Sequence, residues 1–327
     1  GRASVGANPM VGCVITRDGK IVAKDYHRQY GKGHAEVNAL DQIKHRGKSA
    51  KLYVTLEPCS HQGKTSPCTN ALIKAGVKKV VVAMLDPNPV GSGRGVKLLK
   101  DAGIEVDIGL LQSEAMELNR GFVKRMETGM PFVTTKIAMS LDGGTAMGSG
   151  ESQWITSDAA RLDVHKLRGN NQAIMTGSGT IINDNPKMTA RINDSEPNPL
   201  RVIVDSGNMI TDHKLNIFSS EASTLVLNDG NARILPNGKI DLKLALIKLG
   251  EMGINYLLLE TGSGLNGAML EAGLIDEFII YTAPVILGSD TKPMIEIPLT
   301  KISEKIQLNI LDIRKIGEDI KIKAVLK

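Results

Sequence analysis

Short strand patterns alternate with helix patterns along almost the whole chain, and this alternation constrains the fold more than any other feature of the sequence. Such alternation is typical of an α/β architecture with mainly parallel sheets. It is interrupted by Gly129-Met130-Pro131, a combination that ends helices. Because 327 residues suit two domains of about 100–200 residues each, we predict an α/β protein with domains at residues 1–129 and 130–327.

The first half contains short elements with clear turn signals. Asp18-Gly19 joins the first two predicted strands in a hairpin, and Gly76 and Gly103 end two of the predicted helices. We expect strands at 11–16, 20–27, 52–56, 79–85 and 105–110, and helices at 35–44, 69–75, 94–102 and 112–127.

The second half repeats this alternation. Ser157 is expected to cap a helix that runs to Arg168, with Asp158 in its first turn. The tail at 306–326 alternates apolar and polar residues in two runs, which predicts a hairpin. We expect strands at 132–138, 173–176, 201–205, 224–227, 256–260 and 277–282, and further helices at 242–249 and 265–272.

Composition and charge exclude several classes of protein. Hydrophobic residues make up 42% of the chain, yet no apolar stretch approaches the roughly 20 residues that span a membrane. The chain has 40 basic and 35 acidic residues without a basic block, so we expect an anionic small molecule as partner, and neither a nucleic acid nor a membrane. We see no signal peptide, although the chain begins at Gly1 without a Met, and three cysteines suit a reducing compartment. We therefore expect a cytoplasmic protein.

One histidine, two cysteines and a glutamate follow the order of a catalytic zinc site. His34 and Glu36 lie close together, Cys59 follows Glu57-Pro58, and Cys68 comes soon after. Two thiolates and one imidazole are three ligands, and zinc with three protein ligands keeps a position for water. Bound zinc lowers the pKa of that water to roughly 7. The pattern predicts a zinc deaminase site with His34, Cys59 and Cys68 as ligands and Glu36 as the proton carrier.

Each of these residues has a simpler interpretation when it is taken alone. His34 is then an ordinary surface histidine, and Cys59 and Cys68 are small core residues. A structural zinc site would need a fourth ligand. His61 is the nearest candidate, but it also has the reach to touch a substrate. The ordered set favours catalytic zinc.

Two further segments of the first half leave their role open. Gly63-Lys64-Thr65 looks like the end of a phosphate-binding P-loop, but Pro58 stands where that motif requires glycine. Lys64 is then either a point charge for an anion or a solvated side chain. Asn8 either belongs to a turn before the first strand or binds an amide-bearing ring.

The glycine motifs of the second half suggest a nucleotide site. The segment from Gly262 to Gly267 fits G-x-G-x-x-G, in which backbone N–H groups approach a phosphate at a helix N-terminus. The acidic residue expected about 20 residues later is missing, so we predict a phosphate loop on a non-Rossmann sheet. Thr176-Gly177-Ser178-Gly179-Thr180 repeats this geometry. Both motifs could equally be helix-start turns.

Two arginines and the single tryptophan are ambiguous by themselves. Arg168 and Arg191 could each offer a planar guanidinium to a phosphate, although most arginines are only solvated. Trp154 is expected to pack in a core more often than to stack on a ligand.

Several segments together are specific to one family. They are His34-Ala35-Glu36, the run from Thr55 to Cys68, Asp86-Pro87-Asn88-Pro89, Ser140-Leu141-Asp142-Gly143 and the run from Gly150 to Thr156. In this order, and over essentially the whole chain, the sequence resembles the bifunctional deaminase/reductase family of bacterial riboflavin biosynthesis. The long spacing between Cys59 and Cys68 fits that family better than a generic cytidine deaminase.

For the first domain, the resemblance implies a cytidine-deaminase-like fold with zinc on His34, Cys59 and Cys68. The substrate would be 2,5-diamino-6-(5-phosphoribosylamino)pyrimidin-4-one, and hydrolysis at the ring carbon that bears the amine would release ammonia, with Glu36 as proton shuttle. The family's substrate-binding positions correspond here to Asn8, His61, Lys64, Asp86 and Asn88.

For the second domain, the resemblance implies a dihydrofolate-reductase-like fold that reduces the ribosyl group to ribityl with NADPH. Lys136 and Asp184 are candidates for polar assistance at the reducing centre. The family also implies a dimer or tetramer formed through this domain's sheet, and a further helix before Gly1. The implied NADPH site comprises Ala138, Trp154, Thr180, Asp184, Ser206, Gly262, Ser263, Gly264, Leu265, Asn266, Gly267 and Ala268. The implied substrate site comprises Ser152, Arg168, Met188, Arg191 and Glu260.

Two other functions share part of this pattern. A nucleic-acid or nucleoside deaminase with an accessory domain would use the same zinc chemistry, but it should carry a basic and aromatic surface, and aromatic residues make up only 3% of the chain. A non-catalytic zinc-stabilised binding module would not need Glu36 for its function.

Overall fold

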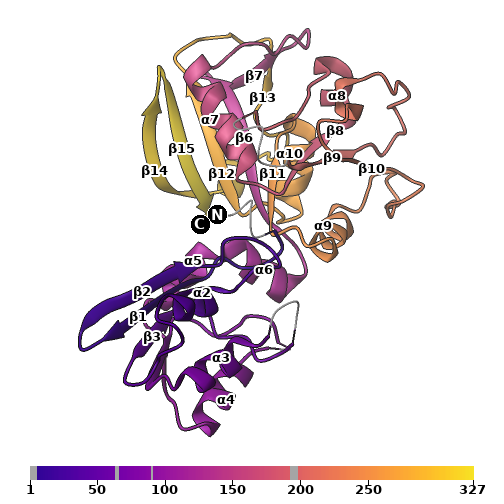
Figure 1. Ribbon diagram of the computed structural model, residues 1–327. Helices are drawn as coiled ribbons and strands as arrows, with labels where there is room; N and C mark the ends of the chain where they lie inside the picture. Colours follow the sequence, from indigo (N-terminus) through magenta and orange to yellow (C-terminus); the bar gives the residue numbers. More distant parts are fainter. Residues whose placement is uncertain (1–5, 63–65, 90, 192–197) are drawn as a thin grey trace. The chain divides into compact units, whose positions relative to one another are not determined.

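The computed structural model describes residues 6–62, 66–89, 91–191 and 198–327. The chain divides into two compact units, Gly1–Gly129 and Met130–Lys327, which are described separately (Figure 1). Within the described residues, the structure contains no helix with the length and apolar character that membrane crossing requires.

Unit 1 is built on a five-stranded mixed sheet with the strand order β2-β1-β3-β4-β5. The first two strands form the expected hairpin, and β3, β4 and β5 run parallel to one another. The strands are β1 (Gly12–Arg17), β2 (Lys20–Tyr26), β3 (Lys51–Val54), β4 (Lys79–Val82) and β5 (Glu105–Ile108). The helices between them are α2 (Ala35–Gln42), α3 (Cys68–Ala75) and α4 (Arg94–Asp101).

The apolar side chains of the helices and strands of unit 1 meet in one core. Leu40 of α2, Leu72 of α3 and Leu99 of α4 are each fully buried and belong to the same cluster as Ile15 and Leu52 of the sheet. Burying a leucine side chain stabilises the fold by about 1.5–3 kcal/mol. This shared core fixes the starts of α2 and α3 relative to the sheet, and those two helix starts carry the predicted metal ligands.

The prediction of a single helix at 112–127 is wrong. The structure has two helices, α5 (Gln112–Leu118) and α6 (Arg120–Thr128), which meet at the non-helical residue Asn119. The buried Asn119 amide oxygen accepts the Met10 N–H at 2.7 Å, and its amide nitrogen donates to the Met10 carbonyl at 2.8 Å. Asparagine side chains that bind backbone groups compete with helical hydrogen bonding, and here this contact coincides with the break.

Unit 2 contains an eight-stranded sheet with the order β10-β9-β8-β11-β6-β12-β15-β14. Strands β10 through β12 of this order run parallel, and β15 and β14 add an antiparallel edge. The strands are β6 (Phe132–Ser140), β8 (Ala173–Gly177), β9 (Leu200–Val204), β10 (Thr224–Leu227), β11 (Tyr256–Leu259), β12 (Glu277–Ala283), β14 (Leu308–Ile316) and β15 (Asp319–Leu326). The helices α7 (Asp158–Gly169), α9 (Leu242–Glu251) and α10 (Ser263–Glu271) agree with the expected segments to within a few residues.

The short helix α8 (Ser178–Asp184) begins within Thr176–Thr180, the segment whose pattern indicated a strand–glycine–helix turn. Other short elements of unit 2 were not predicted. They are the 3-10 turns at Asn216–Phe218 and Ile302–Glu304, and a small two-stranded sheet of β7 (Gly144–Met147) and β13 (Thr291–Pro293). Each is three or four residues long, which is too short for hydrophobic periodicity to identify reliably.

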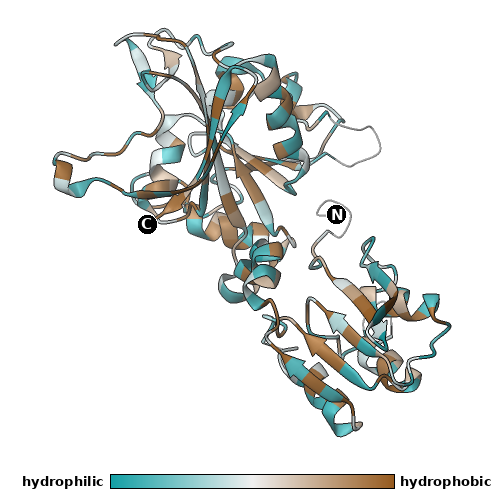
Figure 2. Ribbon diagram, turned by 90° about the vertical axis from the view of Figure 1, so that its left-hand side faces the viewer, coloured by the Kyte–Doolittle hydropathy of each residue, from teal (hydrophilic) through white to brown (hydrophobic). Residues whose placement is uncertain are grey.

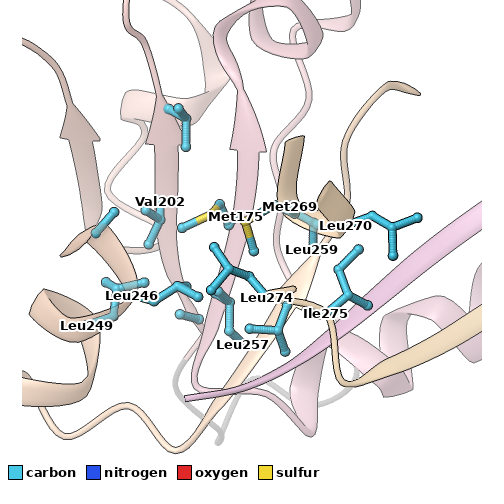
Figure 3. Packing of buried hydrophobic residues seen from close by; sticks show 14 of the residues in the cluster. Met175, Val202, Leu246, Leu249, Leu257, Leu259, Met269, Leu270, Leu274 and Ile275 are labelled. Carbon is cyan, nitrogen blue, oxygen red and sulfur yellow. The ribbon is translucent and has the colours of Figure 1, made fainter. Parts of the chain in front are cut away.

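The main core of unit 2 lies between its sheet and its helices. Met175, Val202, Leu257 and Leu259 come from neighbouring strands, and they pack with residues of α9 and α10 that include Leu246 (Figure 3). The central strands carry mostly hydrophobic residues, as expected for strands buried on both faces (Figure 2).

The predicted cap of α7 is present and is reinforced from the tail of the chain. The Ser157 hydroxyl accepts the Ala160 N–H, as an N-cap should. The buried carboxylate of Asp319, at the start of β15, accepts hydrogen bonds from the Ser157 N–H at 2.9 Å and the Ser157 hydroxyl at 2.6 Å. The tail hairpin therefore holds the beginning of the helix that carries Arg168.

Two glycines of the G-x-G-x-x-G segment differ in their surroundings, which gives a test of the fold. A Cβ atom at Gly267 would overlap the backbone carbonyl of Glu296, whereas a Cβ at Gly262 would meet no atom within 4 Å. We predict that Gly267→Ala lowers the free energy of unfolding of unit 2 by about 1–3 kcal/mol, as overpacking does. The matched control Gly262→Ala should cost less than about 1 kcal/mol. Urea unfolding followed by circular dichroism would measure both, and equal costs would contradict the packing argument.

Candidate zinc and nucleotide sites

The three predicted metal ligands converge in unit 1. The ligand atoms of His34, Cys59 and Cys68 all lie within 4.8 Å of one another. His34 Nδ1 faces both sulfurs, at 3.2 Å from Cys68 Sγ and 3.5 Å from Cys59 Sγ. With Zn–S bonds of about 2.3 Å and Zn–N bonds of about 2.0 Å, tetrahedral ligands lie about 3.5–3.8 Å apart. The donor set suits zinc, and the His34–Cys59 separation matches this range while the His34–Cys68 separation is slightly shorter.

The local structure explains why these side chains meet. His34 is the extended N-cap residue of α2, and Cys68 is the first residue of α3, directly after Pro67. Cys59 lies in the turn that follows β3, and its sulfur accepts the Cys68 N–H at 3.3 Å. Two of the three ligands thus sit at helix N-termini, where backbone N–H groups favour negative charge.

The electrostatics of the cluster favour a thiolate at Cys59. Its hydrogen bond with Cys68 lowers the pKa of Cys59 to about 4, and the hydrogen bond with His34 acts in the same direction against the effect of burial. The same contact with Cys59, together with burial, raises the pKa of Cys68. The hydrogen bond to Cys59 raises the pKa of His34. These contacts therefore favour a thiolate at Cys59.

Glu36 lies beside the cluster but is not one of the three ligands. It stands in the first turn of α2, is 3% exposed, and is absent from the group of ligand atoms. Burial raises its pKa to about 7, and the negative charge of Cys59 adds to this effect. A carboxyl group with such a pKa can both accept and release a proton near neutral pH.

The cluster opens into a pocket of about 320 Å³. This size lies within the range of small-molecule sites. Burial raises the pKa of Asp86 in this pocket. His61 lines the pocket and does not belong to the ligand group, so it is not the fourth ligand of a structural zinc site. The pocket brings together the predicted residues Asn8, His34, Glu36, Cys59, His61, Asp86 and Asn88. Lys64 lies outside the described residues.

His27 is a pocket residue that sequence reasoning missed. Its Nδ1 lies 3.2 Å from the Gly33 carbonyl oxygen, and its Nε2 lies 3.3 Å from the Asn8 amide nitrogen. Because a carbonyl only accepts, Nδ1 carries the proton and Nε2 accepts from Asn8. Burial lowers the pKa of His27, which suits this neutral form. The predicted hairpin could have identified His27, because pairing of β1 with β2 brings the residue after β2 close to the residues that precede β1.

In unit 2, the buried carboxylate of Glu260 is paired with two half-buried cations. The Arg168 guanidinium binds the Glu260 carboxylate with two nitrogens, at 2.6 and 3.0 Å, and Lys136 Nζ lies 3.3 Å from the same carboxylate. Arg168 also donates to the Thr189 carbonyl, and Arg191 donates to the Thr189 hydroxyl. Arg168, Glu260 and Arg191 of the predicted substrate site are thus linked to one another, and Lys136 joins them.

Other predicted residues of unit 2 have varied surroundings. The Ser152 hydroxyl donates to Asp184 at 3.1 Å, which joins a predicted substrate residue to a predicted cofactor residue. Met188 is 3% exposed inside a hydrophobic cluster, so its side chain is a core group. The Ser206 hydroxyl accepts the Ile240 N–H. Ala138 and Thr180 are partly exposed.

The expectation that Trp154 packs in a core is wrong. Its side chain is 70% exposed, and the Arg161 guanidinium stacks over the ring at 4.6 Å from the centroid. A buried tryptophan contributes much apolar contact area to a core. The exposed Trp154 indole, on the loop before α7, makes no such contribution and is available to contact a ligand.

The G-x-G-x-x-G segment divides into an outer and an inner part. Gly262 caps α10 directly after β11, and Gly262, Gly264 and Ala268 are exposed, with Ser263 and Leu265 partly exposed. Asn266 is buried and binds the Thr135 hydroxyl at 2.7 Å. Only the outer residues have backbone that a phosphate could reach.

Comparisons with known proteins cover both units. Residues 131–322 match the family described as the RibD C-terminal domain, and residues 2–84 match the cytidine and deoxycytidylate deaminase zinc-binding region. The chain is 43% identical to riboflavin biosynthesis protein RibD of Escherichia coli strain K12, over 98% of this chain and 94% of that protein. A RibD protein of Bacillus amyloliquefaciens is 40% identical over 100% of this chain and 93% of its own length.

Solved structures agree with these matches. RibD of Acinetobacter baumannii superposes with a TM-score of 0.92 at 39% identity, covering 100% of this chain and 95% of that one. A diaminohydroxyphosphoribosylaminopyrimidine deaminase/5-amino-6-(5-phosphoribosylamino)uracil reductase of Thermotoga maritima gives a TM-score of 0.88 at 32% identity, covering 99% of this chain and 94% of that one. The fold is therefore a deaminase unit followed by a dihydrofolate-reductase-like unit, and the chain belongs to the RibD family of riboflavin-biosynthesis enzymes, which join a zinc-binding deaminase to a pyrimidine reductase.

Proposed function

We propose that unit 1 deaminates 2,5-diamino-6-(5-phosphoribosylamino)pyrimidin-4-one at the pocket that contains His34, Cys59 and Cys68. The observation that carries this proposal is the three-ligand cluster with the unligated Glu36 beside it, in a pocket of about 320 Å³. Zinc, when bound, supplies a Lewis acid that lowers the pKa of water. The related Thermotoga maritima protein is a diaminohydroxyphosphoribosylaminopyrimidine deaminase, which is the same type of activity.

The residues of the chain have distinct roles in this proposal. Glu36 accepts the proton of the attacking water and delivers it toward the departing amine, which a pKa of about 7 allows in both directions. Asn8, held by His27, offers an amide edge to the pyrimidine ring. His61, Asp86 and Asn88 line the pocket and would contact the remainder of the substrate.

We predict that Glu36→Gln abolishes ammonia release while the chain keeps its zinc. Glutamine is nearly isosteric but cannot accept and return a proton, and general acid–base catalysis contributes about 10²–10⁴-fold. Ammonia assays and metal analysis on the same sample measure both properties. The exposed Glu114 provides the control Glu114→Gln, which should behave like the wild type. Full activity of Glu36→Gln would favour a zinc-stabilised binding module.

We further propose that unit 2 reduces the ribosyl side chain of the deaminated product to ribityl with NADPH. The start of α10 fits the cofactor, because Gly262 and Gly264 leave backbone exposed at a helix N-terminus. Thr180, Asp184, Ser206, Ala138 and Trp154 would complete the cofactor site. NADPH, when bound, supplies the reducing equivalents.

The substrate side of this site would be formed by the charged group and its neighbours. Arg168 and Arg191 would offer guanidinium groups to the substrate phosphate. Ser152 and the backbone of Met188 would complete the substrate site. Lys136 carries a positive charge beside Glu260 and can donate a hydrogen bond to a sugar oxygen. Asp184 is the second candidate for polar assistance.

We predict that the purified chain oxidises NADPH with the deaminated substrate, and that NADH supports a lower kcat/KM. Cys59→Ser should lose deamination and zinc but keep reduction of deaminated substrate, because the cysteine belongs to a separate unit. Absorbance at 340 nm follows the reduction. Loss of both activities in Cys59→Ser would argue against two independent sites.

The ionisation of Glu260 makes the stability of unit 2 depend on pH. Burial opposes its charge, but Arg168 and Lys136 outweigh burial and lower the pKa of Glu260 from 4.5 to about 2. A carboxylate with a depressed pKa stabilises the fold above its unfolded pKa, and this contribution is lost as the pH falls from about 4.5 toward 2. The difference between these two pKa values corresponds to about 3 kcal/mol.

We therefore predict that Glu260→Gln flattens the loss of stability of unit 2 between pH 5 and pH 3. Urea unfolding at several pH values would measure the slope. The exposed Glu271 on α10 provides the control Glu271→Gln, which should keep the wild-type slope. An unchanged slope in Glu260→Gln would show that the charged group does not set the acid sensitivity.

We also propose that the chain forms a homo-oligomer, a dimer or tetramer, through the sheet of unit 2. Ile310, Leu311 and Ile313 are 53%, 52% and 60% exposed on β14, the edge strand of that sheet. Exposed apolar edge strands favour pairing with another chain.

The thiol ligands require reducing conditions, so we place the protein in the cytoplasm.

A further inference from the structure

Glu57 is a buried carboxylate that has no role in the reaction described above. It is 6% exposed and lies two residues before Cys59. Its oxygens accept three backbone N–H groups: Oε2 accepts from Asp86 at 3.1 Å and from Gly93 at 2.9 Å, and Oε1 accepts from Val96 at 3.0 Å. The Glu57 side chain thus accepts hydrogen bonds from Asp86 and Gly93, at the two ends of the loop between β4 and α4, and from the first turn of α4.

The loop that Glu57 holds carries two residues of the pocket. Asp86 and Asn88 line the pocket, and the Asp86 carboxylate accepts the Asn88 N–H at 2.9 Å. The Asn88 carbonyl in turn accepts from Gly91 and Ser92. The described part of the loop is therefore a compact turn, and its position depends on the points at which it is attached to the rest of unit 1.

The first turn of α4 also packs directly on the turn that bears the metal ligand. A Cβ atom at Gly95 would overlap the Pro58 carbonyl oxygen and would lie 3.2 Å from Glu57 Oε1. Only glycine allows this approach. The Glu57-Pro58-Cys59 turn and the loop with Asp86 and Asn88 are thus attached to each other by hydrogen bonds and by close packing.

We propose that Glu57 is a positioning residue that sets the distance between the metal cluster and the substrate-contacting side chains of Asp86 and Asn88. This inference rests on the proposed function, because it takes the pocket as the deaminase substrate site. Glu57 is not one of the metal ligands, and although it is among the residues that line the pocket, both of its carboxylate oxygens accept backbone N–H groups of the loop and of α4. In this proposal it therefore acts through the loop.

The chemistry of the contact requires a carboxylate. An ionised carboxylate only accepts hydrogen bonds, and both Glu57 oxygens face N–H donors. In Glu57→Gln, one of those oxygens becomes an NH₂ group that points at an N–H. Either the Val96 N–H or the Asp86 and Gly93 N–H groups then lose their acceptor. The loop and the first turn of α4 are no longer held by the same side chain, while the length of that side chain is unchanged.

The experiment compares Glu57→Gln, Asn88→Ala and the double variant in steady-state deamination. We expect Glu57→Gln to raise KM roughly tenfold with kcat changed less than about threefold, since binding is lost without loss of the proton carrier. In the Asn88→Ala background, Glu57→Gln should raise KM only about threefold or less, because the two changes act through one contact. Glu57→Asp, which keeps the charge but shortens the side chain, should lie between wild type and Glu57→Gln.

Three controls separate positioning from general damage. Zinc content should remain at the wild-type level in Glu57→Gln. Reduction of deaminated substrate by the same sample should be unchanged, since the reductase residues lie in the other unit. Glu114→Gln makes the same chemical change at an exposed position of unit 1 and should leave KM unaltered.

The possible results distinguish this inference from the proposed function. If Asn88→Ala raises KM but Glu57→Gln does not, the positioning role is overturned and the pocket assignment stands. If Asn88→Ala leaves KM unchanged, the pocket assignment fails and the positioning role fails with it. Loss of zinc in both Glu57→Gln and Glu57→Asp would overturn the proposal, because Glu57 would then support the metal turn itself. Equal KM increases in the wild-type and Asn88→Ala backgrounds would also overturn it.

Discussion

The meeting of His34, Cys59 and Cys68 is the interaction on which the deaminase half depends. Each of these residues would be unremarkable alone, and the fold brings them together by placing two helix starts beside the turn after β3. The N–H of Cys68 and its thiol stabilise negative charge on Cys59. Metal binding is then favoured by a site that is already arranged, because little ordering remains to be done when the ion binds.

Unit 1 holds the segments around this cluster with buried polar side chains that bind backbone groups. Asn119 makes two hydrogen bonds with Met10, close to the Asn8 that lines the pocket, and Glu57 binds the loop of Asp86 and Asn88. Apolar packing alone would leave such loops several nearly equivalent positions, since it is not directional. Hydrogen bonds with fixed donors and acceptors select one position.

Much of this architecture follows from local sequence signals. The alternation of strands and helices, the Asp18-Gly19 hairpin and the Ser157 cap all depend on neighbours in the sequence, and the structure contains each of them. The break at Asn119 depends on Met10, far along the chain, so no local pattern identifies it. The environment of His27 depends on the pairing of the β1–β2 hairpin, which brings it to Asn8. Trp154 illustrates the same limit, because general residue preferences place an indole inside and only the loop geometry shows that it is exposed.

The Asp319 contact with Ser157 has a consequence for the order in which the two units fold during synthesis. Strand β15 lies between β12 and β14 in the sheet, so the reductase half lacks an inner strand and the support of its α7 cap until the tail has been synthesised. The deaminase unit, Gly1–Gly129, precedes this tail in the chain. During translation, domains fold as units in order of emergence. Unit 1 can thus begin to fold while unit 2 still lacks β15, whose Asp319 binds the start of α7.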